Sequence, residues 1–285
     1  MNDKSSEIKP IAYLCNGKTL TFNRPLIMAI VNITPDSFYD GGKYSRIDDI
    51  LNDVEDKINQ GADIIDIGAA SSRPGASEIS ESEEWLRLKE VLPEIRKRFA
   101  NIFISVDTFQ SGIAKKCADE GVDMINDISG GCLDVLMLDT IAELNLPYIL
   151  MHMDGSPSNM NKNSEYKEVA QEVKTKIQHQ IHLLNSKGFE KIIIDPGFGF
   201  GKSLKNNYEL LKHLDSFQSL GYPILSGLSR KSMINKIIHT NPVTSLNGTT
   251  VLNTIALLNG SNILRVHDVV EAKQTIELVS YYQNV

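Results

Sequence analysis

Short apolar runs rich in Ile and Val alternate along the chain with longer amphipathic segments. Each run has the length of a buried strand. The runs cover residues 26–32, 62–68, 102–107, 122–127, 147–152, 191–197, 222–227 and 262–268. Segments between them, such as DDILNDVEDKINQG, carry apolar residues at helical spacing. Strand and helix are therefore expected to alternate through the whole chain.

Three of the helical segments run into a glycine just before the next strand, at Gly61, Gly121 and Gly188. A left-handed residue belongs at such a helix end. Eight strands without a linker predict one α/β domain, a (β/α)₈ TIM barrel over residues 26–285, although an open doubly wound sheet has the same alternation. Residues 1–25 are predicted to form an N-terminal extension, with NGKTLTF as a hairpin.

Composition narrows the class of protein. The 285 residues are 41% hydrophobic, which is enough for a substantial core, and their net charge of −7 without any Lys/Arg run disfavours a nucleic-acid partner. The three cysteines form no CxxC pair, which disfavours a disulfide framework or a zinc site. No apolar run is long enough to span a membrane. A cytoplasmic protein is expected.

Polar groups stand at the ends of nearly all the predicted strands, where a barrel carries its chemistry. One Asp or Asn after a strand is usually a turn former or a helix N-cap, and Asp66 and His152 are interpreted in that way. The convergence of so many groups on one rim favours a functional site. These groups are Asn32, Asp66, Asp107, Asn126, His152, Asp195, Arg265 and His267, with Ser229, Arg230 and Lys231 just beyond 222–227.

The rim divides into two chemical halves. Closure of a barrel would set Arg265 and His267 beside Asn32, and cations with an amide oxygen suggest a polyphosphate with Mg²⁺. Arg73 would join them from the loop after the second strand. The other half offers hydrogen-bonding groups that suit a flat heterocycle, namely Asp107, Asn126, Asp195 and Lys231. The segment GFGFGKS lacks the P-loop spacing, which excludes a nucleotide triphosphatase.

An ordered set of segments resembles the signature segments of dihydropteroate synthases. They are IVNITPDSF, SSRPGA, SVDT, INDISGG, LMHMDGSP, IDPGFGFGKS, GLSRKSMI and RVHDV, which together span roughly residues 26–270. The resemblance implies a homodimeric TIM barrel that joins 6-hydroxymethyl-7,8-dihydropterin pyrophosphate to 4-aminobenzoate and releases pyrophosphate. This is a step of folate biosynthesis and the target of sulfonamides.

The resemblance also implies roles for individual residues. Asn32 would be the Mg²⁺ ligand, and Arg73, Arg265 and His267 would bind pyrophosphate. Asp107, Asn126, Asp195 and Lys231 would bind the pterin. The 4-aminobenzoate would meet Ser72, Pro74, Phe200 and Ser232. The residues expected to act in catalysis, by an S_N1-like transfer, are Asn32, Arg73, Asp107, Lys231, Arg265 and His267.

The second loop departs from the usual family pattern. Residues 68–75 read GAASSRPG, with Ala70 where the family has Glu and Ser72 where it has Thr. Activity is expected to survive this change, because Ser72 keeps the hydroxyl. Two alternatives to the synthase are a methyltetrahydrofolate corrinoid methyltransferase on the same barrel and a paralogue that binds pterin without turnover. The first should need neither the Asn32 loop nor SSRPGA, and the sequence has both.

Overall fold

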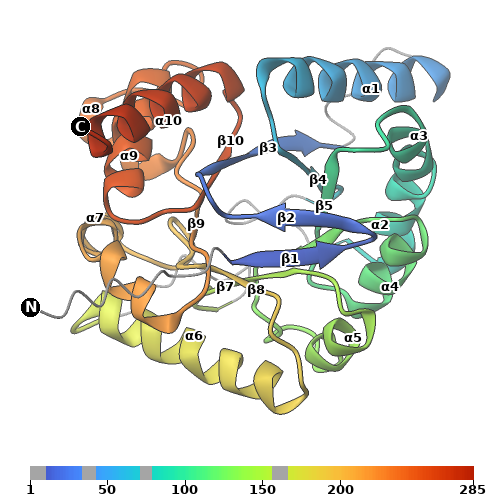
Figure 1. The fold of residues 1–285 in the computed structure, drawn as a ribbon, viewed down its shortest axis with the longest axis horizontal. Coiled ribbons are helices and arrows are strands. Elements are labelled where there is room, and N and C mark those ends of the chain that lie inside the picture. Colours follow the sequence, from blue (N-terminus) through green and yellow to red (C-terminus); the bar gives the residue numbers. More distant parts are fainter. Residues whose placement is uncertain (1–10, 34–42, 71–78, 156–165) are drawn as a thin grey trace, which may run out of the picture.

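Eight parallel strands form the centre of the molecule in a computed structural model that describes residues 11–33, 43–70, 79–155 and 166–285. Their order is β8-β7-β6-β5-β4-β3-β10-β9, and a parallel bridge from Ile194 to Ile224 joins the two ends of that order. The sheet is therefore a closed barrel (Figure 1). The strands are β3 (Leu26–Asn32), β4 (Ile64–Gly68), β5 (Phe103–Asp107), β6 (Met124–Asp127), β7 (Tyr148–Met151), β8 (Ile192–Asp195), β9 (Leu225–Ser226) and β10 (Ile263–Val266).

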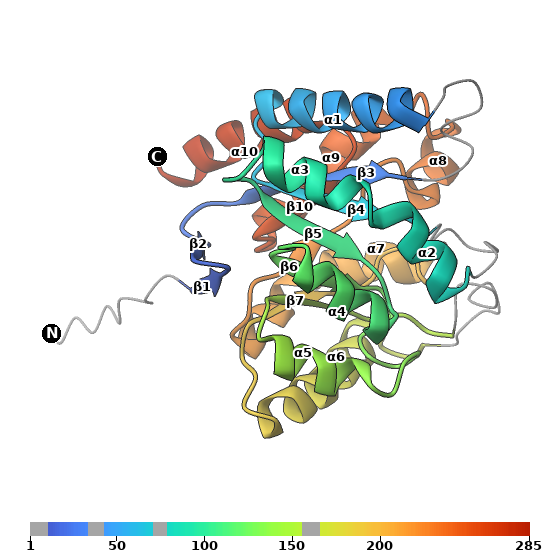
Figure 2. The same cartoon turned by 90° about the vertical axis from the view of Figure 1, so that its right-hand side faces the viewer.

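Helices surround this barrel, as the predicted alternation requires (Figures 1 and 2). Gly61, Gly121 and Gly188 have positive φ at helix ends, which confirms their predicted role. None of the helices in the described ranges is long and apolar enough to cross a membrane. The helices are α1 (Lys43–Gln60), α2 (Glu81–Leu88), α3 (Val91–Arg98), α4 (Ser111–Asp119), α5 (Met137–Leu144), α6 (Val169–Ser186), α7 (Leu204–Lys212), the 3₁₀ helix η2 (Leu214–Leu220), α8 (Ser232–Ile238), α9 (Leu246–Leu258) and α10 (Val269–Gln283).

Side chains on each strand alternate between the helices and the barrel interior, because a strand has a period of two. On β4, Ile65 and Ile67 belong to the core shared with the helices. Ile64 instead packs in a second, inner cluster, which also contains residues from β3, β6, β7, β8, β9 and β10. This inner cluster fills the amino-terminal half of the barrel and leaves the carboxyl half for polar groups.

A two-stranded hairpin covers the amino end of the barrel. It consists of β1 (Ala12–Cys15) and β2 (Lys18–Thr21) and lies at the end opposite to the carboxyl ends of the strands (Figure 2). Tyr13, Cys15 and Leu20 belong to the inner cluster, and the Tyr13 hydroxyl donates to the carbonyl oxygen of Ile192 at 2.7 Å. The predicted hairpin is confirmed, and it closes the base of the core.

Candidate functional site

A ring of polar side chains occupies the carboxyl half of the barrel interior. Strand alternation puts these residues on the same inward face as the inner cluster, one or two steps closer to the carboxyl ends. Six strands contribute, with Asn32 on β3, Asp66 on β4, Asp107 on β5, Asn126 on β6, Asp195 on β8 and Arg265 on β10. The site is therefore a direct consequence of the strand period and of closure.

Arg265 is the centre of this ring. Its Nε donates to Asp66 Oδ2 at 2.7 Å, and its Nη2 donates to Asp107 Oδ2 at 2.8 Å. Asn126 Nδ2 donates to the same Asp66 oxygen at 3.1 Å. Four strands are joined by these bonds, so the orientation of the guanidinium is fixed before any ligand binds.

Asp66 is not the turn former that the sequence suggested. It lies in the middle of β4, is fully buried, and accepts hydrogen bonds from both Arg265 and Asn126. A signal for this was present in the sequence: Asp66 shares the inward parity of Ile64, two residues earlier in the same strand. A carboxylate at that depth needs a cationic partner inside the barrel.

Burial and charge act against each other in this cluster. Burial raises the pKa of Asp107, whereas the neighbouring Arg265 guanidinium lowers it. Burial also raises the pKa of Asp195, against the opposing effect of Lys231. For Arg265 burial lowers the pKa, but Asp66 and Asp107 outweigh it and the net pKa is raised. The guanidinium is therefore the fixed charge of the site.

Lys231 reaches the ring from the turn before α8. Its ammonium donates to the carbonyl oxygen of Phe198 and lies 4.9 Å from the centre of the Phe200 ring. Burial lowers the pKa of Lys231 to about 8, while Asp195 opposes that shift. Ser232 is the first residue of α8. Lys231, predicted to bind the heterocycle, therefore lies beside Phe200 and Ser232, which were predicted to bind the aminobenzoate.

His267 and Asn32 stand at the outer edge of the ring. His267 Nδ1 shares a hydrogen bond of 2.9 Å with Ser229 Oγ. Burial lowers the pKa of His267 to about 4, and Arg265 lowers it further, so the imidazole is neutral at pH 7. Asn32 is exposed, and a Cβ on Gly68 would lie 3.4 Å from its Oδ1. Gly68 therefore leaves the space beside the Asn32 amide open.

The Asn32 amide is compatible with Mg²⁺ but would be a minor part of the ion's shell. The described residues contain no cluster of three or more His, Cys, Asp or Glu that could hold a metal. Mg²⁺ commonly takes one or two protein ligands and completes its shell with water and phosphate oxygens. An exposed amide oxygen at the carboxyl end of β3 fits that pattern, and the donor set fits no structural metal site.

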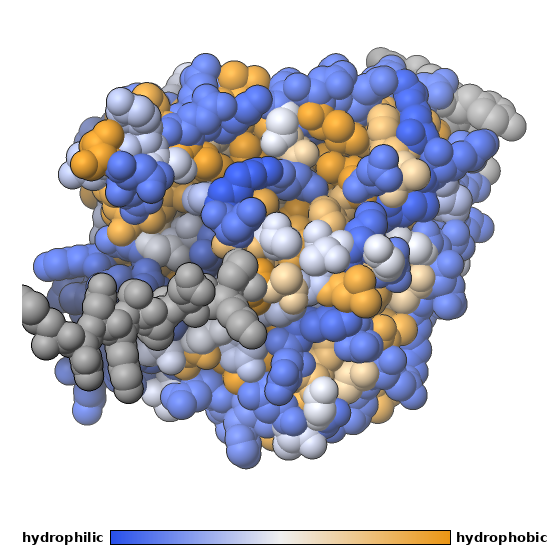
Figure 3. Space-filling model, viewed as in Figure 1, coloured by the Kyte–Doolittle hydropathy of each residue, from blue (hydrophilic) through white to orange (hydrophobic). Residues whose placement is uncertain are grey.

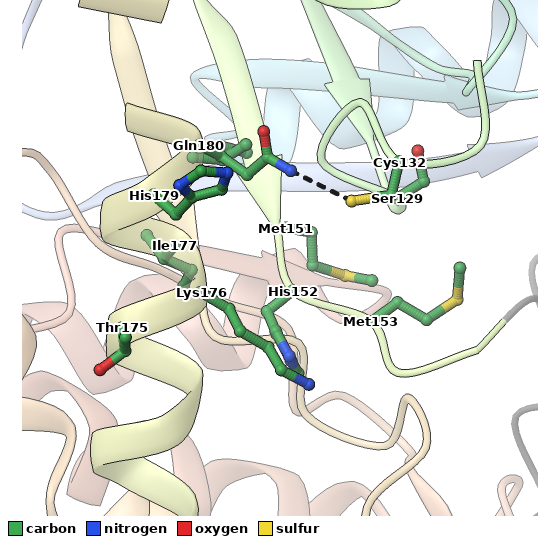
Figure 4. Close-up of a pocket in the computed structure, with 11 residues that line it drawn as sticks. Ser129, Cys132, Met151, His152, Met153, Thr175, Lys176, Ile177, His179 and Gln180 are labelled. Carbon is green, nitrogen blue, oxygen red and sulfur yellow. Dashed lines mark hydrogen bonds between the residues drawn. The ribbon is translucent and has the colours of Figure 1, made fainter. Parts of the chain in front are cut away.

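His152 lies outside the ring. It follows β7 on the outward parity, is buried, and lines a cavity of about 390 Å³ beside α6 (Figure 4). Neither ring nitrogen has a hydrogen-bond partner within the described part of the chain, and burial lowers the pKa of His152 to about 2. The prediction that His152 does not belong to the site agrees with this position.

The loop after β4 carries three further predicted residues. Ser72, Arg73 and Pro74 lie outside the described residues, as does the segment 34–42 that follows Asn32. Their roles stay predictions. Every other predicted site residue is described and lies at or next to the carboxyl end of the barrel.

Comparisons with known proteins agree on one family. The family model described as "Pterin binding enzyme" matches residues 28–267. The chain is 41% identical to the dihydropteroate synthase of Haemophilus influenzae, over 92% of this chain and 96% of that protein. The dihydropteroate synthase of Yersinia pestis, solved as a sulfonamide drug complex, has a TM-score of 0.90 and 37% identity, covering 96% of this chain and all of that one. That of Xanthomonas albilineans, solved with 4-aminobenzoic acid, has a TM-score of 0.89 and 35% identity, covering 96% and 98%.

Proposed function

The chain belongs to the family of pterin binding enzymes, and we propose that it joins 6-hydroxymethyl-7,8-dihydropterin pyrophosphate to 4-aminobenzoate and releases pyrophosphate. The dihydropteroate synthases of Haemophilus influenzae and Escherichia coli are about 40% identical to this chain over nearly their whole length. A structure from Xanthomonas albilineans holds 7,8-dihydropteroate, the product of this reaction. The observation that carries the proposal is the ring of inward polar groups around Arg265, which matches both halves of the first substrate.

The pterin would occupy the half of the ring opposite the phosphate groups. Asp195, a buried carboxylate, accepts a hydrogen bond from Gly197 N at 2.7 Å through Oδ1, which leaves Oδ2 for ring N–H groups. Asp107 would accept from the ring edge, and the Asn126 amide could both donate to it and accept from it. Lys231 would donate to a ring nitrogen or carbonyl. Such a set of paired donors and acceptors recognises a flat heterocycle with amino and carbonyl edges.

Pyrophosphate would bind on the side of Arg265, His267 and Arg73. Arg265 uses Nε and Nη2 for its carboxylate partners, so Nη1 is the donor left for a phosphate oxygen. His267 Nδ1 is engaged with Ser229, so Nε2 is the nitrogen left for the ligand. We propose that Asn32 would help to hold a Mg²⁺ ion, which would neutralise charge on the leaving group.

The 4-aminobenzoate would lie between the pterin and α8. The Phe200 ring offers an apolar face, and the Ser232 hydroxyl offers a donor for the carboxylate. Ser72 and Pro74 would complete this side from the loop after β4. An arylamine has a free lone pair at neutral pH, so the site needs no strong general base.

The proposed chemistry is an S_N1-like transfer. The C–O bond to pyrophosphate breaks first, its electron pair leaves with the phosphate oxygen, and the conjugated ring stabilises the methylene cation. The amine nitrogen then forms the new C–N bond and loses one proton to water. The protein's part is to hold the two reactants in line and to stabilise the leaving anion through Arg265, His267 and Arg73.

The first experiment is to measure pyrophosphate release from dihydropterin pyrophosphate and Mg²⁺, with and without 4-aminobenzoate. Release coupled to dihydropteroate formation is expected. Tight pterin binding without either product would contradict the proposal and favour the binding-only paralogue. Asn32→Ala and Arg265→Ala test the assigned roles, and nearly full turnover in either variant would overturn that assignment.

We also propose that the chain forms a homodimer through α8, α9 and α10. Large apolar side chains are exposed on these helices, and Figure 3 shows apolar residues among hydrophilic ones over the corner that they form. A contiguous exposed apolar surface marks an interaction site. The exposed side chains include Ile237, Ile238, Val251, Ile255, Leu258, Val270, Leu278, Tyr281 and Tyr282.

A cytoplasmic location, which suits three unpaired cysteines, stays a prediction.

A further inference from the structure

The loop between β8 and α7 packs with its backbone directly on the loop that follows β7. Gly197 has φ of 73°, and a Cβ there would lie 1.9 Å from the carbonyl oxygen of His152. Gly201 has φ of 67°, and a Cβ there would lie 2.6 Å from the carbonyl oxygen of Asp154. No side chain fits between the two loops at these points. The backbone carbonyls that are brought together at this contact therefore need side chains that donate hydrogen bonds to them.

Lys202 is the group that satisfies them. Its Nζ donates to the carbonyl oxygens of His152 at 3.2 Å, Gly197 at 2.7 Å and Phe200 at 3.2 Å. An ammonium group has three donors, and all three are used. Two of the acceptors belong to the β8–α7 loop and the third follows β7, so one side chain joins the loops.

A buried asparagine fixes the other side of the same loop. Asn207 accepts from Gly199 N at 2.7 Å and donates to the carbonyl oxygen of Lys202 at 3.0 Å. These bonds tie the loop to α7, the helix that follows it. Lys202 alone, among the side chains described here, ties the loop carbonyls to the end of β7.

Lys231 holds the same loop from the opposite side. Its ammonium donates to the carbonyl oxygen of Phe198. In the proposed function the same ammonium also donates to the pterin, and its three N–H donors allow it to keep the bond to Phe198. Lys202 faces no ligand in the proposed site and keeps its three carbonyls. Lys202 donates to the carbonyl oxygen of Phe200 itself, whereas Lys231 donates two residues earlier, so the position of Phe200 depends directly on Lys202.

We propose that Lys202 is a positioning residue for 4-aminobenzoate. It holds the carbonyl of Phe200, and thereby the Phe200 ring, at the correct distance from the pterin site. The inference rests on the proposed function and deepens it. It predicts that loss of the Lys202 ammonium weakens the second substrate and leaves the first unaffected.

The test is Lys202→Met, which shortens the unbranched side chain by one heavy atom and removes its donors. The Kd for dihydropterin pyrophosphate is measured by calorimetry, and the KM for 4-aminobenzoate from pyrophosphate release. Both are measured at pH 6.5, because burial lowers the pKa of Lys202 to about 7. We expect the KM for 4-aminobenzoate to rise about tenfold, which corresponds to the loss of about one net hydrogen bond. The Kd for dihydropterin pyrophosphate should stay within about twofold.

The matched control is Lys205→Met, three residues later at an exposed position on α7. This variant should change neither constant. If Lys202→Met does not fold, as judged by thermal unfolding, Lys202→Gln keeps an amide donor and should give a smaller rise in KM. An unchanged KM, or equal losses of both ligands, would overturn the inference. Failure of the unaltered protein to release pyrophosphate would instead contradict the proposed function.

Discussion

At the scale of single residues, Asp66 decides how the site is organised. One carboxylate oxygen receives Arg265 Nε and Asn126 Nδ2, and Asp66 belongs to no loop. Removal of one partner from a buried ion pair leaves the other charge uncompensated. Arg265 would keep Asp107 but lose the bond that sets its rotation. Asp66 therefore positions the guanidinium and the Asn126 amide, although neither role requires contact with substrate.

Asp66→Asn should reduce kcat/KM strongly. The amide keeps the volume of the carboxylate but removes its charge, so Arg265 and Asn126 are no longer held in the same orientation. We expect a loss on the order of 100-fold, which corresponds to about 3 kcal/mol of transition-state stabilisation. Steady-state pyrophosphate release at saturating 4-aminobenzoate measures it. Activity within about threefold of the unaltered protein would show that Asp66 is only structural.

Asp123→Asn is the matched control. Asp123 is also fully buried and is paired with Lys18 and Arg96, but these bonds lie at the amino end of the barrel. This variant should lose stability to a similar extent and keep its kinetic constants. A comparison of the two variants thus separates the loss of a buried carboxylate from the loss of a group that orients the site.

At the scale of elements, the strand-helix alternation could be predicted from periodicity alone, since each apolar run has one strand's length. The boundaries could not. The predicted strand 222–227 is only two residues long in the structure, as β9. Pro223, just before β9, has no N–H to donate to the sheet, although its carbonyl accepts from Ile194 N. The polar groups at the strand ends could also be predicted, because they lie at or directly after the ends of the apolar runs. The parity with Ile64 gave the inward position of Asp66 but not its partners Arg265 and Asn126, which lie far away in the sequence. The role of Lys202 could not be predicted either, because its acceptors are backbone carbonyls.

The hairpin at the base of the barrel gives a prediction about stability. Leu20 is 2% exposed and packs in the inner cluster, so Leu20→Ala should lower the free energy of unfolding by about 2–4 kcal/mol. Leu14 lies in the partner strand of the same hairpin but is 59% exposed, so Leu14→Ala should change it by less than about 0.5 kcal/mol. Urea unfolding of both variants measures the difference. Equal effects would mean that the hairpin does not close the core. Neither variant should alter KM.

At the scale of the whole molecule, the apolar corner of α8–α10 predicts assembly. Leu278 on α10 is 73% exposed, so most of its apolar surface is in contact with water in the monomer. Leu278→Asp should place a charge in the proposed interface and shift the protein from dimer to monomer in light scattering. Val135 is 89% exposed before α5, away from that corner, and Val135→Asp is the control. A monomeric unaltered protein would contradict the proposal.

Two buried neutral histidines make the folded state sensitive to acid. Burial lowers the pKa of His152 to about 2 and that of His267 to about 4, from 6.5. The unfolded chain therefore binds more protons below pH 6.5, and stability is lost as the pH falls from about 6.5 toward the folded pKa values. From pH 7 to pH 5, each such histidine should remove about 2 kcal/mol from the free energy of unfolding.

His152→Gln isolates this contribution, because glutamine has no titration in that range and His152 lies outside the substrate ring. The two proteins differ only at residue 152, so the difference between their unfolding curves belongs to that residue. We expect the unaltered protein to lose about 2 kcal/mol more than His152→Gln between pH 7 and pH 5. His179, exposed on α6, serves as the control, and His179→Gln should match the unaltered protein. If all three proteins show the same pH dependence of urea unfolding, His152 is protonated in the folded state and its burial does not keep it neutral.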